Sequence, residues 1–123
     1  MAHYAELNSN NEVINVVYMD NEIIFNKNKE ECEHLGIEYL HKHHGSDKKW
    51  VRTSYNGNFR GNYASLGDTY REDIDAFIKP QPFSSWKLNI ETSQWEPPIP
   101  DPSNEINSYY WDENNKNWIL VVK

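Results

Sequence analysis

The chain has 123 residues, a length that fits one domain or a small domain with an appended segment. Its formal net charge of -7 argues against a protein that binds nucleic-acid phosphates through a basic face, and against one that binds an anionic membrane surface. Hydrophobic residues make up only 37% of the chain but aromatic residues make up 14%, so we expect a folded protein with a small, aromatic-rich core.

The N-terminal segment has the pattern of short strands joined by turns. Residues 12–19 are rich in Val and Ile, which favour strands, and residues 8–11 are Asn and Ser, which favour turns. We therefore predict a β-hairpin in which residues 4–7 pair with residues 12–19. After a further turn, residues 22–25 are expected to form another short strand.

Residues 28–44 hold the one convincing helical pattern of the chain. Asn26 or Asn28 is expected to cap the N-terminus of this helix, and its basic end is followed by Gly45, a residue suited to a helix C-terminus. Gly36 interrupts the pattern. The expected buried face of the helix consists of Cys32, Leu35, Tyr39 and Leu40, which recur at helical spacing.

The elements after this helix are predicted to be strands. Residues 50–55 have strand character, and Asn56-Gly57 behind them is the strongest signal in the chain for a two-residue hairpin turn. Three further hairpins are expected, and they pair residues 68–70 with 76–78, 86–88 with 94–96, and 109–111 with 117–119.

An eight-residue frame occurs three times towards the end of the chain. Each copy begins on a large apolar or aromatic residue, passes through a polar centre and closes on an aromatic residue seven positions after its start. Repeated small β-units favour a modular structural surface and give no indication of a catalytic centre. The copies are residues 70–77, 88–95 and 111–118.

Glycine and proline are segregated along the chain. All five Gly residues lie between positions 36 and 67, and all six Pro residues lie between positions 80 and 102. Gly marks a tightly turned section, whereas Pro marks an extended section with few backbone hydrogen bonds. We therefore expect an α+β fold in two parts. Residues 1–79 form a small antiparallel sheet with one helix, and residues 80–123 form a Pro-rich C-terminal extension with two β-hairpins.

No residue pattern points to a reaction, a metal or a cofactor. The acid pairs Glu72 with Asp75 and Asp112 with Glu113 fall in expected turns, where acidic residues are common because they are solvated. Neither a nucleophile motif nor a phosphate-binding loop is present. Five potential metal ligands lack the spacing of a known metal motif: Cys32, His34, His41, His43 and His44. We expect a protein that is not an enzyme and that has no metal site and no cofactor.

Residues 50–63 interleave aromatic residues with Arg and Asn. This mixture suits a sugar, bound by ring stacking and amide hydrogen bonds, or a protein hot spot. The interpretation that we favour is that Trp50, Tyr55, Phe59 and Tyr63 fill a small core. If the segment binds a glycan instead, the contact candidates are Trp50, Tyr55, Arg60 and Tyr63.

Aromatic residues of the two C-terminal hairpins are the candidates for contact with a partner. An isolated hairpin is marginal in water and buries its aromatic side chains poorly. These side chains either stack on each other, pack on the N-terminal part or anchor to another chain, and the Pro-rich linkers favour the last. The candidates are Trp86, Trp95, Tyr110, Trp111 and Trp118.

Four stretches of the chain carry a family resemblance. They are residues 50–64 (WVRTSYNGNFRGNYA), residues 70–78, residues 80–98 and the opening residues 1–7. In these stretches the chain resembles small proteins encoded by marine tailed bacteriophages, cyanophages in particular, which are mostly uncharacterised or grouped with virion components. The resemblance implies a phage origin, and it implies no catalytic or binding residues. The segment HKHH at 41–44 departs from the usual pattern, in which the helix end is more apolar.

These observations predict a non-catalytic bacteriophage structural or accessory protein of the capsid, neck or tail. It is expected to act by protein–protein contact, with other virion proteins or by self-association, and to bind neither nucleic acid nor a membrane. One alternative is a carbohydrate-binding module of a tail fibre that reads a host-surface glycan, and another is a small phage protein that modulates a host protein. No secretory signal, no membrane span and only one cysteine are visible, so we expect synthesis in the host cytoplasm. The resemblance to phage proteins implies location in the virion.

Overall fold

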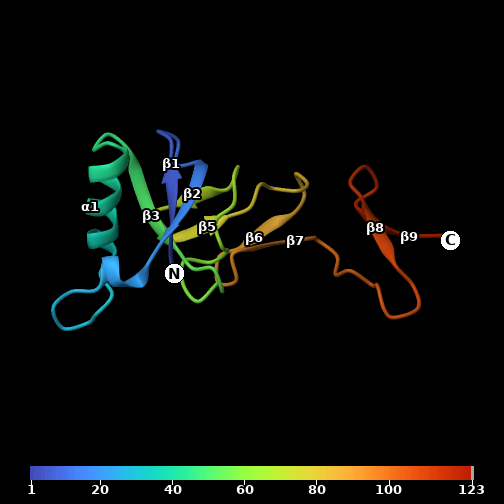
Figure 1. The fold of residues 1–123 in the computed structure, drawn as a ribbon. Coiled ribbons are helices and arrows are strands. Elements are labelled where there is room, and N and C mark those ends of the chain that lie inside the picture. The colour runs from blue at the N-terminus through green and yellow to red at the C-terminus, as the bar shows by residue number, and fades with distance from the viewer. Residues whose placement is uncertain (123) are drawn as a thin grey trace. The chain divides into compact units, whose positions relative to one another are not determined.

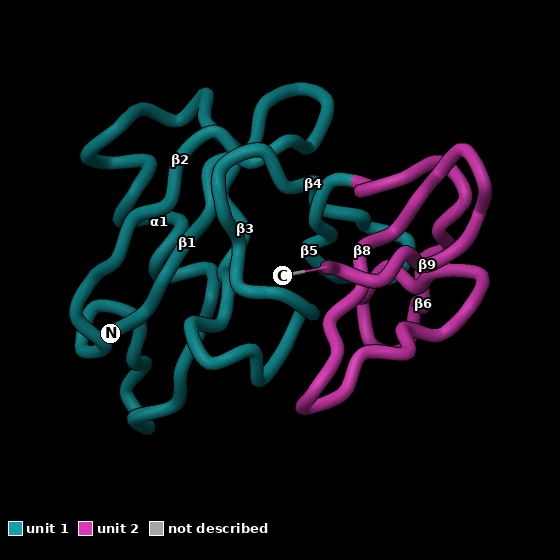
Figure 2. Tube along the Cα trace, turned by 90° about the vertical axis from the view of Figure 1, so that its right-hand side faces the viewer, with its two compact units in different colours: residues 1–80 teal, residues 81–123 magenta. Residues whose placement is uncertain are grey.

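The computed structural model describes residues 1–122, which contain one α-helix, one short 3₁₀ helix and nine strands. The chain divides into two compact units, residues 1–80 and residues 81–123 (Figure 2). The strands form small antiparallel sheets, and together with the helix they make a mixed α and β fold, as the sequence predicts. No helix within the described residues is long and apolar enough to cross a membrane.

Unit 1, residues 1–80, is built on a three-stranded antiparallel sheet with the strand order β2-β1-β3 (Figure 1). β1 (Ala2–Leu7) pairs with β2 (Val13–Met19) on one side and with β3 (Lys49–Thr53) on the other. Asn8 closes the turn between β1 and β2, because its Oδ1 accepts two backbone N–H groups at 2.9 and 3.0 Å. The predicted N-terminal hairpin is confirmed.

Each face of this sheet packs against another element, and each of the two contacts forms a separate apolar cluster. On one face, the helix α1 (Glu33–His44) packs over the sheet, and Figure 1 shows it beside β3. On the other face lies the hairpin of β4 (Thr69–Arg71) and β5 (Ala76–Ile78). The helix-side core contains Ala2, Tyr4, Met19, Ile24, Leu40 and Trp50. The hairpin-side core contains Ala5, Leu7, Val13, Val51, Ala64, Tyr70 and Phe77.

The segment after β2 forms a 3₁₀ helix, η1 (Asn21–Ile24), so the prediction of a strand at residues 22–25 is wrong. Asp20 accounts for the difference, because its carboxylate accepts the backbone N–H of Glu22 at 3.1 Å and caps the helical turn. The turn carries Ile24 into the helix-side core, where it is fully buried.

The helix α1 begins at Glu33, five residues later than the sequence pattern indicates, and ends at His44 as predicted. The late start is explained by Asn26, whose Oδ1 accepts two backbone N–H groups at 2.8 and 2.9 Å and closes a separate turn before the helix. Cys32 takes the N-cap position without a side-chain hydrogen bond. Neither Asn26 nor Asn28 caps the helix, and that prediction is wrong.

The buried face of α1 also differs from the predicted one. Leu40 is buried as expected, but Tyr39 is 38% exposed, and Gly36 lies on the buried face. The side chain of Tyr4 crosses this face, and its hydroxyl donates to the Glu33 carbonyl at 3.0 Å. A Cβ at Gly36 would lie 2.2 Å from the Tyr4 hydroxyl oxygen. The glycine that interrupts the helical pattern therefore makes room for a tyrosine of the sheet.

Replacing Gly36 by alanine is expected to destabilise unit 1, although alanine favours a helix by about 1 kcal/mol over glycine. The added Cβ must displace the buried ring of Tyr4, and overpacking of this kind costs about 1–3 kcal/mol. Urea denaturation of the Gly36→Ala variant measures the change. Glu38→Ala, at an exposed position of the same helix, is the control and should change stability little. Equal stability of the two variants would contradict the packing described for Tyr4.

The chain beyond β3 does not form the hairpin that Asn56-Gly57 signals, and no strand follows before β4. The dipeptide does make a turn, in which the Gly57 N–H donates to the Ser54 carbonyl at 3.0 Å, and Gly57 has a φ of 69°. Side chains occupy the outer edge of β3 in place of a strand. Glu33 accepts the backbone N–H of Arg52 at 2.9 Å, and Arg60 donates to the Arg52 carbonyl at 3.0 Å.

Unit 2, residues 81–123, contains two β-hairpins. In the first, β6 (Lys87–Asn89) pairs with β7 (Gln94–Glu96), and in the second, β8 (Tyr109–Asp112) pairs with β9 (Asn117–Leu120). Both hairpins lie within one residue of where the sequence predicts them, as does the β4–β5 hairpin of unit 1.

The eight-residue frame marks the same hairpin in all three copies. The first and last residues of each copy face each other across the two strands, and the pairs are Tyr70 with Phe77, Leu88 with Trp95, and Trp111 with Trp118. Each loop has four residues, and the fourth has a positive φ between 49° and 61°; these residues are Asp75, Ser93 and Lys116. The repeat is therefore a repeat of backbone geometry as well as of residue type.

Candidate functional site

Three tryptophans of unit 2 pack against each other. Trp111 and Trp118 form the cross-strand pair of the β8–β9 hairpin, with ring centroids 5.2 Å apart and planes at 69°. Trp86, which precedes β6, contacts both rings at 6.1 and 6.2 Å. These are tilted and edge-to-face arrangements of the kind that aromatic rings prefer, and Trp111 is only 7% exposed. Mutual stacking, one of the three possibilities for these side chains, is what the structure shows for this trio, called the Trp cluster below.

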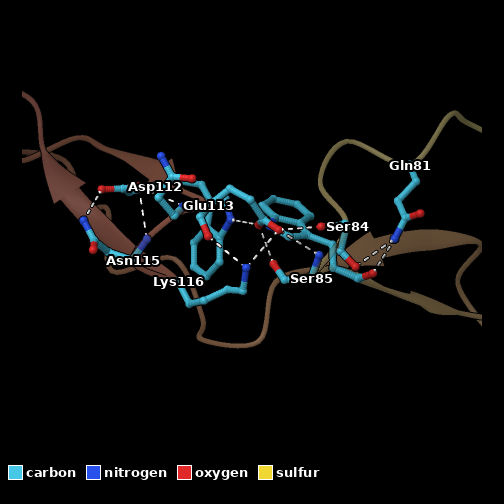
Figure 3. Close-up of polar contacts among 10 residues, drawn as sticks. Gln81, Ser84, Ser85, Asp112, Glu113, Asn115 and Lys116 are labelled. Carbon is cyan, nitrogen blue, oxygen red and sulfur yellow. Dashed lines mark hydrogen bonds and ion pairs between the residues drawn. The ribbon is translucent and has the colours of Figure 1, made fainter.

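Glu113, in the β8–β9 loop, fastens the Trp cluster to the segment before β6 (Figure 3). Its carboxylate accepts the Ser84 hydroxyl at 2.8 Å, the Ser85 hydroxyl at 2.6 Å and the Trp111 indole N–H at 2.8 Å. The Lys116 ammonium pairs with the same carboxylate at 3.2 Å. The hydrogen bonds from Ser85 and Trp111 are the main reasons that the pKa of Glu113 falls to about 2. A turn residue expected to be solvated is instead the acceptor that joins two segments of unit 2.

A cleft of about 350 Å³ opens beside the Trp cluster. The Trp118 indole N–H donates to the Ile99 carbonyl at 2.8 Å, so the Pro-rich segment forms part of its wall. The Trp86 indole N–H is buried and has no acceptor in the part of the chain that the structure describes. The lining is two Trp rings, two Pro rings and two acids: Trp86, Trp118, Pro97, Pro100, Glu96 and Asp101.

The five predicted partner-contact residues do not share one surface. Tyr110 is 55% exposed and lies on the side of its hairpin opposite to Trp111, because neighbouring residues of a strand point to opposite faces. Trp95 is half-buried on the other hairpin. Trp86 and Trp118 are half-buried and line the cleft, whereas Trp111 is interior. Tyr110 is thus the most exposed of the five side chains.

The predicted glycan-contact residues lie in different environments of unit 1. Trp50 is 4% exposed and belongs to the helix-side core, so its ring is closed to a ligand. Tyr55 is 66% exposed and lies against His3 and Tyr63, with ring centroids 5.3 and 5.2 Å away. The interpretation of these aromatics as core residues is confirmed for Trp50 and is wrong for Tyr55 and Phe59, which are exposed.

The fourth predicted glycan contact, Arg60, is the centre of an ion-pair network that joins three elements of unit 1. Its Nε pairs with Asp75 in the β4–β5 loop at 2.9 Å, and its guanidinium pairs with Glu33 at the start of α1 at 2.8 Å. The Tyr70 hydroxyl also donates to Asp75, and this bond is the main cause of the lowered pKa of the Asp75 carboxyl. Burial, together with the same bond, raises the pKa of Tyr70 to about 12. The Arg60 guanidinium already pairs with two carboxylates of the protein, and this suits a structural role.

The histidine-rich end of α1 makes contacts of its own. His41 Nε2 lies 2.8 Å from the Lys48 carbonyl, and His44 lies 5.9 Å from the Trp50 ring. Within residues 1–122, no group of three His, Cys, Asp or Glu side chains is placed to hold a metal ion.

Comparisons of this chain with protein-family models, with curated proteins and with solved structures give no match. Function is therefore inferred from the geometry of the two units.

Sequence reasoning missed several residues that matter at these sites. Glu113 is separated from its serine donors by 28 and 29 positions, and His3 is separated from Tyr55 by most of unit 1. The sequence marks Tyr18 only as a strand residue, yet its ring lies 6.1 Å from that of His3. No local pattern marks such pairs, because the fold alone brings them together.

Proposed function

We propose that this chain is a non-catalytic structural or accessory protein of a bacteriophage virion, located in the capsid, neck or tail, and that it acts by protein–protein contact through unit 2. The phage assignment is supported by the resemblance of the chain to small proteins of marine tailed phages. The mode of action is supported by the surface of unit 2, which offers a way to bind other virion proteins or a second copy of the chain.

The observation that carries the proposal is the number of exposed apolar side chains in unit 2. Fifteen large hydrophobic residues are exposed among residues 1–122, and seven of them belong to unit 2, the smaller of the two units. Exposed large apolar side chains therefore make up a larger share of unit 2 than of unit 1, and exposed apolar area favours a contact surface. The seven are Ile90, Ile99, Ile106, Tyr110, Leu120, Val121 and Val122.

Unit 2 presents its contact residues on an ordered frame. The Trp cluster and Glu113 fix the β8–β9 hairpin to the segment before β6, so Tyr110 projects from a strand that is already in place. Such preorganisation reduces the entropy lost on binding. Ile119 faces Tyr110 across the strands and adds apolar area on the same side. We assign Tyr110 as the anchor, with Ile119 beside it, and Trp111 as a residue that holds the hairpin. Trp86, Trp95 and Trp118 are assigned as further contacts on other surfaces of unit 2.

In this proposal residues 80–123 act as a Pro-rich extension. The six prolines lie between residues 80 and 102, and proline has no N–H to offer a sheet and has a fixed φ. The stretch between the two hairpins therefore resists pairing into a larger sheet, which leaves each hairpin as a separate contact element. An extension with two such elements suits a protein that bridges neighbouring subunits.

Truncation after Pro80 is expected to leave unit 1 folded and to abolish incorporation into virions. Every residue of both core clusters lies at or before Phe77, so the truncation removes none of them. Circular dichroism of the purified fragment checks its folding, and mass spectrometry of purified particles checks incorporation. A truncated chain that enters particles at the normal level would overturn the proposal.

A point variant of the full chain separates contact from folding. Tyr110→Ala is expected to reduce incorporation because it removes the proposed anchor, and Tyr39→Ala, at another exposed tyrosine, is the matched control. Equal incorporation of both variants would remove Tyr110 as the anchor. Absence of the unmodified chain from purified particles would favour the alternative of a small phage protein that binds a host protein.

A further inference from the structure

We propose that unit 1 carries a binding site for a neutral oligosaccharide, separate from the contact surface assigned to unit 2. The site joins a group of four aromatic rings, two of them largely exposed, to a polar pocket that shares residues with it. The proposed virion contact does not use these residues, so the two proposals can fail independently.

The aromatic half of the site is a ring group of four residues, His3, Tyr18, Tyr55 and Tyr63. His3 of β1 and Tyr18 of β2 face each other in the sheet, with ring centroids 6.1 Å apart. Tyr55 stacks on His3 at an interplanar angle of 26°, and Tyr63 meets both rings edge-on. Tyr18 is 69% and Tyr55 66% exposed, so core packing does not account for these rings. Exposed aromatic faces of this kind are surfaces on which the C–H groups of a sugar ring can stack.

The polar half of the site is a pocket of about 220 Å³ that shares His3 and Tyr55 with the ring group. Side-chain amides both donate and accept hydrogen bonds, as sugar hydroxyls do, and they therefore suit a ligand rich in hydroxyl groups. A sugar ring on Tyr55 would direct its hydroxyls towards such groups. The polar lining includes Glu31, Arg52, Asn56 and Asn58.

Arg52 lines this pocket and is held in place by two neighbouring side chains. Its terminal nitrogen pairs with Glu31 at 3.0 Å, and its guanidinium carbon lies 5.2 Å from the centre of the Phe59 ring. The Nε–H of Arg52 is buried and has no acceptor within residues 1–122. Because Glu31 neutralises the guanidinium, the pair offers a donor and an acceptor side by side, which favours an uncharged ligand with adjacent hydroxyls.

The loop that carries Tyr55 and both asparagines is held in shape without a ligand. The Asn58 N–H donates to the Ser54 hydroxyl at 2.9 Å, and the Gly57 N–H donates to the Ser54 carbonyl at 3.0 Å. A preorganised loop loses little entropy when it binds. The net charge of -7 disfavours a nucleic acid, and a protein partner is disfavoured because the pocket is small and mainly polar.

The test uses the full-length protein on an array of immobilised oligomers of glucose, galactose, mannose, rhamnose and N-acetylglucosamine. We expect binding to at least one neutral oligomer, and isothermal titration calorimetry with that oligomer then gives its affinity. Tyr55→Ala is expected to weaken binding about tenfold or more, as the loss of a stacked aromatic contact does. Asn56→Ala should also weaken binding, and Tyr39→Ala, an exposed tyrosine outside the ring group, should leave it unchanged.

Several outcomes would overturn the saccharide site. They are no binding to any oligomer of the array, equal affinity of Tyr55→Ala and the unmodified chain, and an equal loss of affinity in Tyr39→Ala. Because Tyr55 is largely exposed, thermal melting of Tyr55→Ala should match that of the unmodified chain. Normal incorporation of Tyr55→Ala into particles, measured by mass spectrometry, would show that the saccharide site and the virion contact are independent. Loss of incorporation in this variant would instead identify the ring group as a protein contact and overturn the site.

Discussion

The Phe77→Ala variant is expected to lose most of the stability of unit 1. Phe77 is fully buried in the hairpin-side core, and its ring centroid lies 5.1 Å from that of Tyr70, its cross-strand partner. Removal of a buried aromatic side chain leaves a cavity and costs about 3–5 kcal/mol. A domain is stabilised by only about 5–15 kcal/mol, so the variant should be near its limit of folding. Urea denaturation of the full chain, followed by circular dichroism, measures this loss.

The repeat provides a matched control for this variant. Trp95 closes the second copy of the eight-residue frame as Phe77 closes the first, but Trp95 is half-buried. Trp95→Ala is therefore expected to cost about 1 kcal/mol, a value typical of partly exposed positions. Hydrogen exchange assigns each loss to a unit, with faster exchange in residues 1–80 for Phe77→Ala and in residues 81–123 for Trp95→Ala. Equal losses in the two variants would contradict the difference in burial.

The three hairpins of the eight-residue frame were the most predictable part of the fold because their information is local. A spacing of seven positions places the two ends of each frame opposite each other, as for Trp111 and Trp118, and polar residues between them favour the turn. The start of α1 was not predictable in this way. Asn26 has the features of a helix cap, but its side chain closes a turn of its own before the helix. Gly36 reads in the sequence as an interruption of the helix. In the fold, Tyr4 from the strand β1 fills the space that a side chain at this position would need.

The candidate sites show the same division between local and distant information. The mixture of aromatic and amide residues in 50–63 indicates a binding surface, and the structure does bring Tyr55 and Tyr63 together. Trp50 belongs to the same segment, but the strand β3 turns its side chain into the helix-side core. His3 joins the ring group only because β1 is the central strand of the sheet. The types of residue in the site could be predicted from the sequence, whereas which residues come together in it depended on strand pairing.

Acidification is expected to weaken unit 2 through Glu113. The pKa of this carboxyl is lowered from 4.5 to about 2, chiefly because the Ser85 hydroxyl and the Trp111 indole donate to its ionised form. A lowered pKa in the folded state means that the ionised carboxylate stabilises the fold. This contribution is complete above pH 4.5 and is lost as the pH falls through about 2. Thermal denaturation of the full chain across this window should show a falling melting temperature for unit 2.

Glu113→Gln isolates this contribution from that of other acids. Glutamine keeps the size of the side chain but cannot be ionised, so the variant should be less stable at neutral pH and should depend less on pH below 4.5. Glu105→Gln, at an exposed position of the same unit, is the control and should follow the unmodified chain. The ¹H NMR resonance of the Trp111 indole N–H reports on the carboxylate directly, because this group donates to Glu113 at 2.8 Å. Its pH titration should have a midpoint near 2, and a midpoint near 4.5 would mean that these bonds do not hold the charge of Glu113. Since the same bonds tie the Trp cluster to the segment before β6, loss of the charge should also loosen the frame from which Tyr110 projects.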